Sequence, residues 1–425
     1  MASMQYMAGN ARAQRREGRA RVSATSAFLS FLRDSWRAIR EIYLSIILSM
    51  LLGIATGVFF ARFVSRFYAF PGLVITIPAL LAMRGNIFGA SCSRVGTALH
   101  MGLIGDGRGR ILSIEIANTA LLSALTSIVI AVFAVYIAQS MGISASYATL
   151  GFISMVSALI STAIMIPASY ALSVGSYRMG WNPDNVSIPV VATFGDLIMV
   201  LSLTATMSIF FAIASFVFEA FTALYAIAIL ITLMVLGKKG KSPVRAIIVQ
   251  SLPTLTLCAF ISVFAGIIMD ARVESMARYS ALLFILPVFN EQVGNLGGVL
   301  SSRLTSAVHL GTMRVEKLPD NEAVRNFSVI MLVSALTFIS LGIISHAISL
   351  VGLINSPGLL HMIFLTLVGG LSMMIIVCII SYYLIYSYYK LGLDPDNVVI
   401  PLLTTTIDLL GISLIVYLSL IILPL

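Results

Sequence analysis

The chain has 425 residues, of which 59% are hydrophobic and only 10% are charged, and its mean hydropathy is +1.02. Soluble globular proteins carry about 25% charged residues, so this composition excludes a soluble protein and predicts an all-α polytopic membrane protein. The net charge of +9 comes from arginines in the N-terminal segment and short loops, which favours positively charged cytosolic loops over nucleic-acid binding.

Other classes of protein are disfavoured by what the sequence lacks. Cys92, Cys258 and Cys378 lie in apolar segments without paired spacing, so neither a disulfide framework nor a zinc site is predicted. The chain contains no His-Glu-x-x-His, Gly-x-Ser-x-Gly or nucleotide-loop motif, so we expect neither an enzyme nor an organic cofactor.

The N-terminal 41 residues are predicted to form a basic cytosolic tail followed by a helix. Residues 1–23 are polar and rich in arginine. From Ala24 to Glu41 apolar residues fall on one helical face and arginines on another. This pattern favours an amphipathic helix on the membrane surface and a cytosolic extension of the first span about equally.

The rest of the chain is predicted to cross the membrane about eleven times. Five spans cover residues 42–60, 70–102, 111–138, 147–174 and 182–213, a linker span covers 216–236, and five more cover 245–268, 281–311, 327–351, 359–386 and 397–423. The predicted domains are the tail (1–41), a first repeat (42–214), the linker helix with its basic loop (215–244) and a second repeat (245–425). Loop charges place the N-terminus in the cytosol, and the single linker helix makes the two repeats parallel.

A motif in the second span recurs in the second half of the chain. Residues 78–102 and 287–311 share Pro, Gly, Asn, Gly, Ser, Arg, His and Gly at one constant offset of 209 residues, which indicates an internal duplication. The motif places Pro78 and Gly85-Asn86, and likewise Pro287 and Gly294-Asn295, inside apolar helices. We expect each Gly-Asn pair to break its helix and to place an amide oxygen in an ion path. The alternative is a close helix crossing.

A second duplicated motif opens the last span of each repeat. Asn185, Pro189, Thr193 and Asp196 match Asn397, Pro401, Thr405 and Asp408, and their spacing places each set on one helical face. Asp196 lies about 18 Å along the helix from Asp184, hence near mid-bilayer. An ionised carboxylate there costs at least ~2.5 kcal/mol unless it meets water, a cation or a partner. The alternative is that neighbouring Ser or Thr hydroxyls satisfy it.

The remaining residues of the motifs have less specific interpretations. Pro189 and Pro401 should free the carbonyls of Asn185 and Asn397 for an ion, or else only kink their helices. Asp184 and Asp396 are expected either to cap helices or to make the cytosolic mouth acidic. Arg94 and Arg303 should extend to the membrane surface, and His100 and His309 should lie at the cytosolic helix ends. Glu291 matches Ala82, so it is not assigned to a symmetric site.

The deep polar groups supply oxygen ligands, whereas thiolates are lacking and imidazoles are peripheral. Carboxylate, amide and backbone oxygens suit a hard cation that keeps most of its waters, Mg²⁺ before Zn²⁺ or Cu⁺. The candidate metal ligands are Asp196, Asp408, Asn86, Asn295, Thr193 and Thr405. The candidate pore-lining or helix-breaking residues are Pro78, Gly85, Pro189, Pro287, Gly294 and Pro401.

With these motifs the chain resembles the MgtE-like divalent cation transporter family, in the two-repeat form of the eukaryotic magnesium solute carriers, from about Ile42 onwards. The resemblance implies a pore on the pseudo-two-fold axis, lined by the second and fifth helices of each repeat, with Asp196 and Asp408 holding hydrated Mg²⁺. It further implies a protein of the lipid bilayer, expected in the plasma membrane, in which duplication replaces a homodimer so that one chain can act as a monomer. We expect no counterpart of the bacterial magnesium-sensing region, because only about 40 residues precede the first predicted span.

Two other functions remain open at this point. The same site could couple divalent cations to Na⁺ or H⁺ in an exchanger, which the sequence does not distinguish from a channel. A structural or receptor subunit would not need two carboxylates at matching depth. We therefore expect transport of Mg²⁺ or related divalent cations, with no nucleic-acid partner.

Overall fold

The computed structural model describes residues 29–57, 59, 63, 70, 72–103, 109–213, 215–237, 243–270, 280–350 and 356–422. Its helices, after a first helix at Leu29–Gly57, are α2 (Leu73–His100), α3 (Gly109–Ser140), α4 (Tyr147–Arg178), α5 (Pro183–Ala212), α6 (Ser215–Gly237), α7 (Pro243–Asp270), α9 (Ser280–His309), α10 (Asn321–Leu350), α11 (Leu359–Lys390), the 3₁₀ turn η1 (Pro395–Asn397) and α12 (Val399–Ile422). The described residues contain no strand. The basic tail predicted at residues 1–23 lies outside them.

The helices are long and apolar enough to cross a membrane. Within the described residues nine helices meet this criterion, namely the first helix, α2, α3, α4, α5, α7, α10, α11 and α12. The other two expected spans correspond to α6, with 23 residues, and α9, with 30 residues. The prediction of an all-α polytopic fold is confirmed, and the chain is an integral membrane protein.

The first helix runs without a break from Leu29 to Gly57. The residues before the first predicted span therefore continue directly into it from Leu29 onwards. Residues 24–28, which the amphipathic pattern also includes, lie outside the described part. Arg37 and Glu41 form an ion pair at 2.9 Å one turn apart on this helix.

The two halves of the chain exchange their first helices. Ile46 of the first helix is buried in the same apolar cluster as residues of α9–α12, and the hydroxyl of Tyr43 lies 2.8 Å from that of Ser340 on α10. In return, Leu255 of α7 is buried among residues of α2–α5. Each half is thus completed by a helix from the other, which joins the halves into one body.

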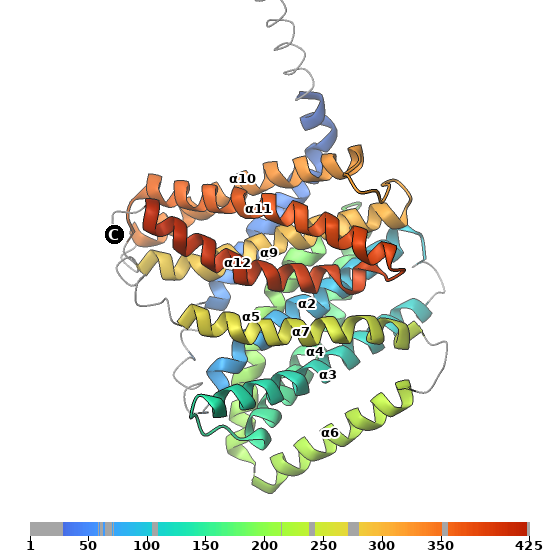
Figure 1. The fold of residues 1–425 in the computed structure, drawn as a ribbon, viewed down its shortest axis with the longest axis vertical. Helices are drawn as coiled ribbons and strands as arrows, with labels where there is room; N and C mark the ends of the chain where they lie inside the picture. The colour runs from blue at the N-terminus through green and yellow to red at the C-terminus, as the bar shows by residue number, and fades with distance from the viewer. Residues whose placement is uncertain are drawn as a thin grey trace, which may run out of the picture.

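Four helices occupy the centre of this body. α2 contacts α5, α9 and α12, and α9 also contacts α5 and α12, so these contacts occur within and between the halves; Figure 1 shows α2, α5 and α9 inside the assembly. The linker helix α6 lies at one end, where it contacts α4 and α3 (Figure 1). The duplicated motifs, which lie on α2, α5, α9, α12 and the turn before α12, are therefore brought together by the fold.

Candidate ion pathway

The pseudo-two-fold axis passes between α2 and α9. Oγ of Ser93 lies 2.9 Å from Oγ of Ser302, and Oγ1 of Thr97 lies 3.3 Å from Oγ of Ser306. Both pairs join residues that are 209 positions apart, the offset of the duplication. Because equivalent residues contact each other only near a two-fold axis, these four side chains, here named the hydroxyl layer, lie on it.

The candidate asparagines contact the candidate threonines of the opposite half. Nδ2 of Asn86 donates to Oγ1 of Thr405 across 3.4 Å, and Nδ2 of Asn295 donates to Oγ1 of Thr193 across 3.4 Å. The amide oxygen of Asn86 also accepts a hydrogen bond from Thr404 at 2.5 Å. All four candidate side chains are buried, so the structure brings them together as pairs that join the halves.

Asp196 and Asp408 lie near each other in the same region. The carboxylate of Asp196 is within electrostatic range of both Asp408 and Glu291. Both aspartates are half-buried, and among the described residues no hydroxyl donates a hydrogen bond to either carboxylate. The structure therefore does not show the alternative in which neighbouring Ser or Thr hydroxyls satisfy these carboxylates. A carboxylate that is ionised inside a membrane and lacks such donors requires water or a cation.

Glu291 belongs to this region although the comparison of the two repeats set it aside. Its carboxylate accepts a hydrogen bond from Thr193 and is within electrostatic range of Asp196. A side chain at Gly53 of the first helix would overlap this carboxylate, so the glycine leaves room for it. Its position one helical turn before Asn295 could have indicated from the sequence that Glu291 lies on the same helix face as that asparagine. The region thus holds a third carboxylate, contributed by the second half alone.

The glycines of the first motif do not break their helices. α2 and α9 are continuous through Gly85 and Gly294, so that prediction is wrong. A Cβ at Gly294 would meet no atom within 4 Å, and at Gly85 it would meet Ala192 only at 4.0 Å. These glycines therefore leave space beside the asparagines and do not form a close crossing. Pro78 and Pro287 lie inside the same helices and are both exposed.

The prolines of the second motif also differ from expectation. Pro189 lies inside α5, but the carbonyl of Asn185 that it frees accepts a hydrogen bond from Oγ of Ser45 at 2.8 Å. This carbonyl is therefore satisfied by the first helix and is not open to an ion. Pro401 lies in the first turn of α12, where a helix has no backbone N–H bond to lose, so it causes no kink.

Asp184 and Asp396 close the axis at the predicted cytosolic end. Each carboxylate accepts two hydroxyl hydrogen bonds from the other half at 2.7–3.1 Å: Asp184 from Ser302 and Ser306, and Asp396 from Ser93 and Thr97. Each aspartate is only 2% exposed, and the helix caps are instead Asn182 and Asp394. The two aspartates therefore neither cap helices nor form an open acidic mouth, because they are the acceptors of the hydroxyl layer.

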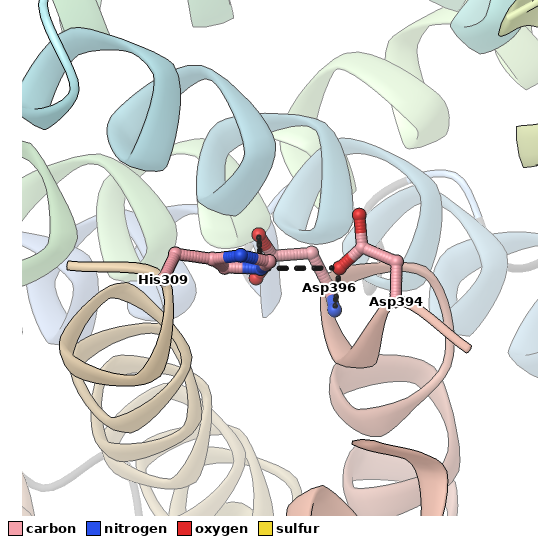
Figure 2. Close-up of side chains that lie close together, drawn as sticks. All are labelled: His309, Asp394 and Asp396. Atoms are coloured by element: carbon pink, nitrogen blue, oxygen red, sulfur yellow. Dashed lines mark hydrogen bonds and ion pairs between the residues drawn. The ribbon is translucent and has the colours of Figure 1, made fainter. Parts of the chain in front are cut away.

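A histidine lies beside each of these aspartates. Figure 2 shows His309 of α9 facing Asp394 and Asp396, with Nε2 at 3.3 Å from Oδ1 of Asp394 and 3.8 Å from Oδ2 of Asp396. Burial, and then the neighbouring Asp394 carboxylate, raise the pKa of Asp396 to about 7. The first half repeats the arrangement with one carboxylate replaced by an amide, in His100, Asn182 and Asp184. In the second half, one ring nitrogen of His309 and one carboxylate oxygen each of Asp394 and Asp396 lie within 4.8 Å of one another. A cation could bridge three atoms at this spacing.

Arg94 and Arg303 do not extend to the membrane surface, contrary to prediction. Each guanidinium is held by one partner in its own half and one asparagine in the other, at 2.7–3.1 Å: Arg94 by Glu115 and Asn397, and Arg303 by Asn326 and Asn185. Arg94 is only 8% exposed. The prediction fails because buried acceptors that lie far away in sequence are close to these side chains in the fold.

Two residues that the sequence analysis missed hold the start of the second motif. Oε2 of Glu41 accepts from the side-chain amide of Asn185 at 2.9 Å, and Oε1 of Gln250 accepts from that of Asn397 at 2.7 Å. Glu41 and Gln250 are themselves 209 residues apart, and this offset could have identified them in the sequence as equivalent residues of the two halves.

Comparisons with known proteins match both halves of the chain. The profile of the MgtE family, described as a divalent cation transporter, matches residues 77–206 and 286–418. Solute carrier family 41 member 2 of Mus musculus is 27% identical over 382 residues, which cover 80% of this chain and 62% of that protein. Solute carrier family 41 member 3 of Rattus norvegicus is 26% identical over 366 residues, which cover 80% of this chain and 78% of that protein.

The chain therefore spans less than two thirds of the length of the member 2 protein. Among solved structures, the eukaryotic MATE transporter AtDTX14 aligns over 91% of this chain and 96% of its own, at 13% identity. The TM-score of this alignment is 0.37.

Proposed function

We propose how this protein works from one premise: the chain belongs to the MgtE family of divalent cation transporters. We infer that it carries divalent cations across the membrane along the pseudo-two-fold axis, between α2, α5, α9 and α12. The proposed domains are the two repeats at 42–214 and 245–425, joined by the linker at 215–244. Because each half is completed by a helix of the other, we further propose that one chain forms a whole pathway. We also propose that the protein resides in the plasma membrane.

The observation that carries the proposal is the pair Asp196 and Asp408. They lie within electrostatic range of each other, and no described hydroxyl satisfies them. Two carboxylates within this range repel each other, and a divalent cation bound by both removes this repulsion while balancing their charge. Protons compete for the same carboxylates, so cation uptake should weaken at acid pH.

The chemistry of the surrounding groups supports Mg²⁺ as the cargo. The candidate ligands that share this region with the aspartates are amides and hydroxyls, which are hard oxygen ligands, and Glu291 adds a carboxylate. The thiol of Cys258 is also within electrostatic range of Asp408, but it donates to the carbonyl of Pro401 at 3.3 Å. Since Asn86, Thr193 and Thr405 already bond other protein groups, they are better suited to shape the site and to contact a hydrated ion than to replace its waters. Mg²⁺ gives up its waters reluctantly and is bound in this way through one or two carboxylates.

Flux into liposomes that contain the purified protein tests the proposal. A magnesium-sensitive dye inside the vesicles should report uptake, which should fall at least about tenfold when Asp196→Asn and Asp408→Asn are combined. Asp34→Asn, a change of equal chemistry at an exposed carboxylate of the first helix, serves as the matched control. Unchanged flux in the double variant would refute the site, and a wild-type protein that passes no divalent cation would refute the function.

Glu291 favours a second candidate function, exchange of the divalent cation against Na⁺ or H⁺. Three carboxylates carry one more negative charge than a divalent cation neutralises, which leaves a charge for a monovalent partner. Reversal potentials separate the two functions: a channel follows the divalent gradient alone, whereas an exchanger shifts with the Na⁺ or H⁺ gradient.

A further inference from the structure

Arg84 of α2 is the largest side chain that the described part of the protein buries completely. Nη1 donates to three hydroxyls of α3 and α4, those of Ser123 at 2.6 Å, Thr162 at 2.9 Å and Ser161 at 3.2 Å. The ring of Phe88 lies 5.9 Å from the centre of the guanidinium. One nitrogen is thus saturated, while the charge of the group is not balanced by these neutral partners.

The other two nitrogens of this guanidinium have no protein partner. Nε and Nη2 donate to no atom of the described residues, and no carboxylate of the described residues forms an ion pair with Arg84. Nε and Nη2 form the edge with which arginine binds an anion through two parallel hydrogen bonds. A guanidinium does not give up its proton in a protein, and an unpaired charge buried in a membrane is costly. The structure therefore leaves an anion-binding edge available at a place that needs a negative charge.

A third donor comes from the linker helix. The hydroxyl of Tyr225 on α6 is within electrostatic range of Arg84 and close to Ser127, yet it too makes no hydrogen bond within the described part. Because α6 packs against α4 and α3, it brings this hydroxyl to the first half alone. In the second half, Val293 stands at the position of Arg84. The linker helix, which has no counterpart in the second half, thus approaches an arginine that also has no counterpart there.

The position of Arg84 limits what could bind there. A Cβ at Gly195 would lie 3.5 Å from the Cβ of Arg84, so the arginine is at the depth of the neighbouring Asp196, near the middle of the bilayer. Lipid headgroups do not reach this depth. A ligand must therefore be small, free and singly negative in order to match one guanidinium charge.

We propose that the Nε and Nη2 edge of Arg84, together with the hydroxyl of Tyr225, binds a small inorganic monoanion, for which chloride is the test ion. This site is separate from the cation pathway, because the guanidinium points from α2 toward α3, α4 and α6. The anion stabilises the first half as a resident ligand, and its binding does not require that the cation proposal be correct.

Thermal unfolding of the purified full chain tests this proposal. Chloride is titrated against gluconate at constant ionic strength, with gluconate as an anion too large to enter. The unfolding temperature of the wild type should rise with chloride and saturate. Tyr225→Phe, which removes one neutral donor, should shift the midpoint of this rise by about tenfold or less, and Arg84→Met should abolish the rise.

A matched control and a direct observation make the test decisive. Tyr382→Phe removes a hydroxyl that bonds the carbonyls of Glu316 and Leu318, so it should lower the unfolding temperature while leaving the chloride dependence intact. Crystals grown in bromide should show an anomalous peak beside Nε and Nη2 of Arg84, which also covers the case that Arg84→Met fails to fold. Equal unfolding temperatures in chloride and gluconate, or an ordered water in place of the bromide peak, would overturn the proposal.

Discussion

Replacing Asp396 by alanine should open the hydroxyl layer on the axis. The carboxylate accepts hydrogen bonds from Ser93 at 2.7 Å and Thr97 at 3.1 Å, both from the other half. Each such bond contributes about 1–3 kcal/mol, depending on whether the acceptor is neutral or charged. The variant therefore loses about 2–6 kcal/mol of gross interaction that favours the closed contact. Even the lower value changes the ratio of closed to open protein by about 30-fold.

Disulfide cross-linking measures this contact directly. Ser93→Cys and Ser302→Cys, in a chain whose three native cysteines are replaced, should oxidise readily because the two hydroxyl oxygens are 2.9 Å apart and a disulfide joins sulfurs at about 2.05 Å. The cross-link should block cation flux, and a reductant should restore it. In this background Ser93 no longer donates its hydroxyl to Asp396, so adding Asp396→Ala removes the bond from Thr97, about 1–3 kcal/mol, and should slow cross-linking at least about fivefold.

Asp34→Ala is the control for this experiment, because the carboxylate of Asp34 is exposed on the first helix and takes no part in the hydroxyl layer. It should leave cross-linking and flux close to those of the parent. If Asp396→Ala behaves like this control in both assays, the hydroxyl layer is not held by that carboxylate. A cross-link that forms but leaves flux unchanged would show that the layer is not on the ion path.

Three further predictions follow from individual contacts. Glu291→Gln should raise the divalent concentration needed for half-maximal flux by about tenfold. Gly53→Ala should raise the same concentration, because the added methyl group displaces the Glu291 carboxylate. If neither variant changes the concentration for half-maximal flux, Glu291 is not part of the site. Because the pKa of Asp396 is raised to about 7 by burial in the closed contact, that contact is strongest below the ordinary carboxyl pKa of about 3.9 and weakens as the pH rises through 7. Cross-linking of the cysteine pair, relative to a control pair elsewhere, should therefore be faster at pH 6 than at pH 8, and Asp396→Asn should remove this difference; equal relative rates in the parent would contradict the assignment. Glu41→Gln should change the free energy of unfolding by less than about 1 kcal/mol, because Gln250 makes the equivalent contact in the other half. Glu41→Ala should lower the free energy of unfolding by about 1–3 kcal/mol. If thermal unfolding shows similar losses in both variants, a glutamine at position 41 does not replace the contact that Glu41 makes.

The sequence predicted the fold class and the central helices for clear physical reasons. Apolar runs of about 20 residues can satisfy their backbone in a membrane only as helices, so the spans follow from composition. The two duplicated motifs selected Asn86 and Asn295, 209 residues apart, and Thr193 and Thr405, 212 residues apart. The structure brings these four side chains together as cross-half pairs. That Asp196 and Asp408 form the ion site is still a prediction. The electrostatic interaction between the two carboxylates supports it.

Features that depend on which helix packs against which could not be predicted. The exchange of the first helix and α7 between halves leaves no periodic signal, because an apolar helix face packs equally well on either neighbour. The same limitation explains the errors at Arg94 and Arg303, whose acceptors Asn397 and Asn185 come from the opposite half. Glu291 was set aside because a symmetric argument cannot identify a residue that only one half carries.

Anomalous diffraction from crystals soaked in Mn²⁺ tests the central claim most directly, since this ion mimics Mg²⁺ and can be located without ambiguity. We predict a peak on the pseudo-two-fold axis between the carboxylates of Asp196 and Asp408, which disappears when both are changed to asparagine. A protein that transports Mn²⁺ but shows no peak there, or a peak that survives the double substitution, would contradict the account.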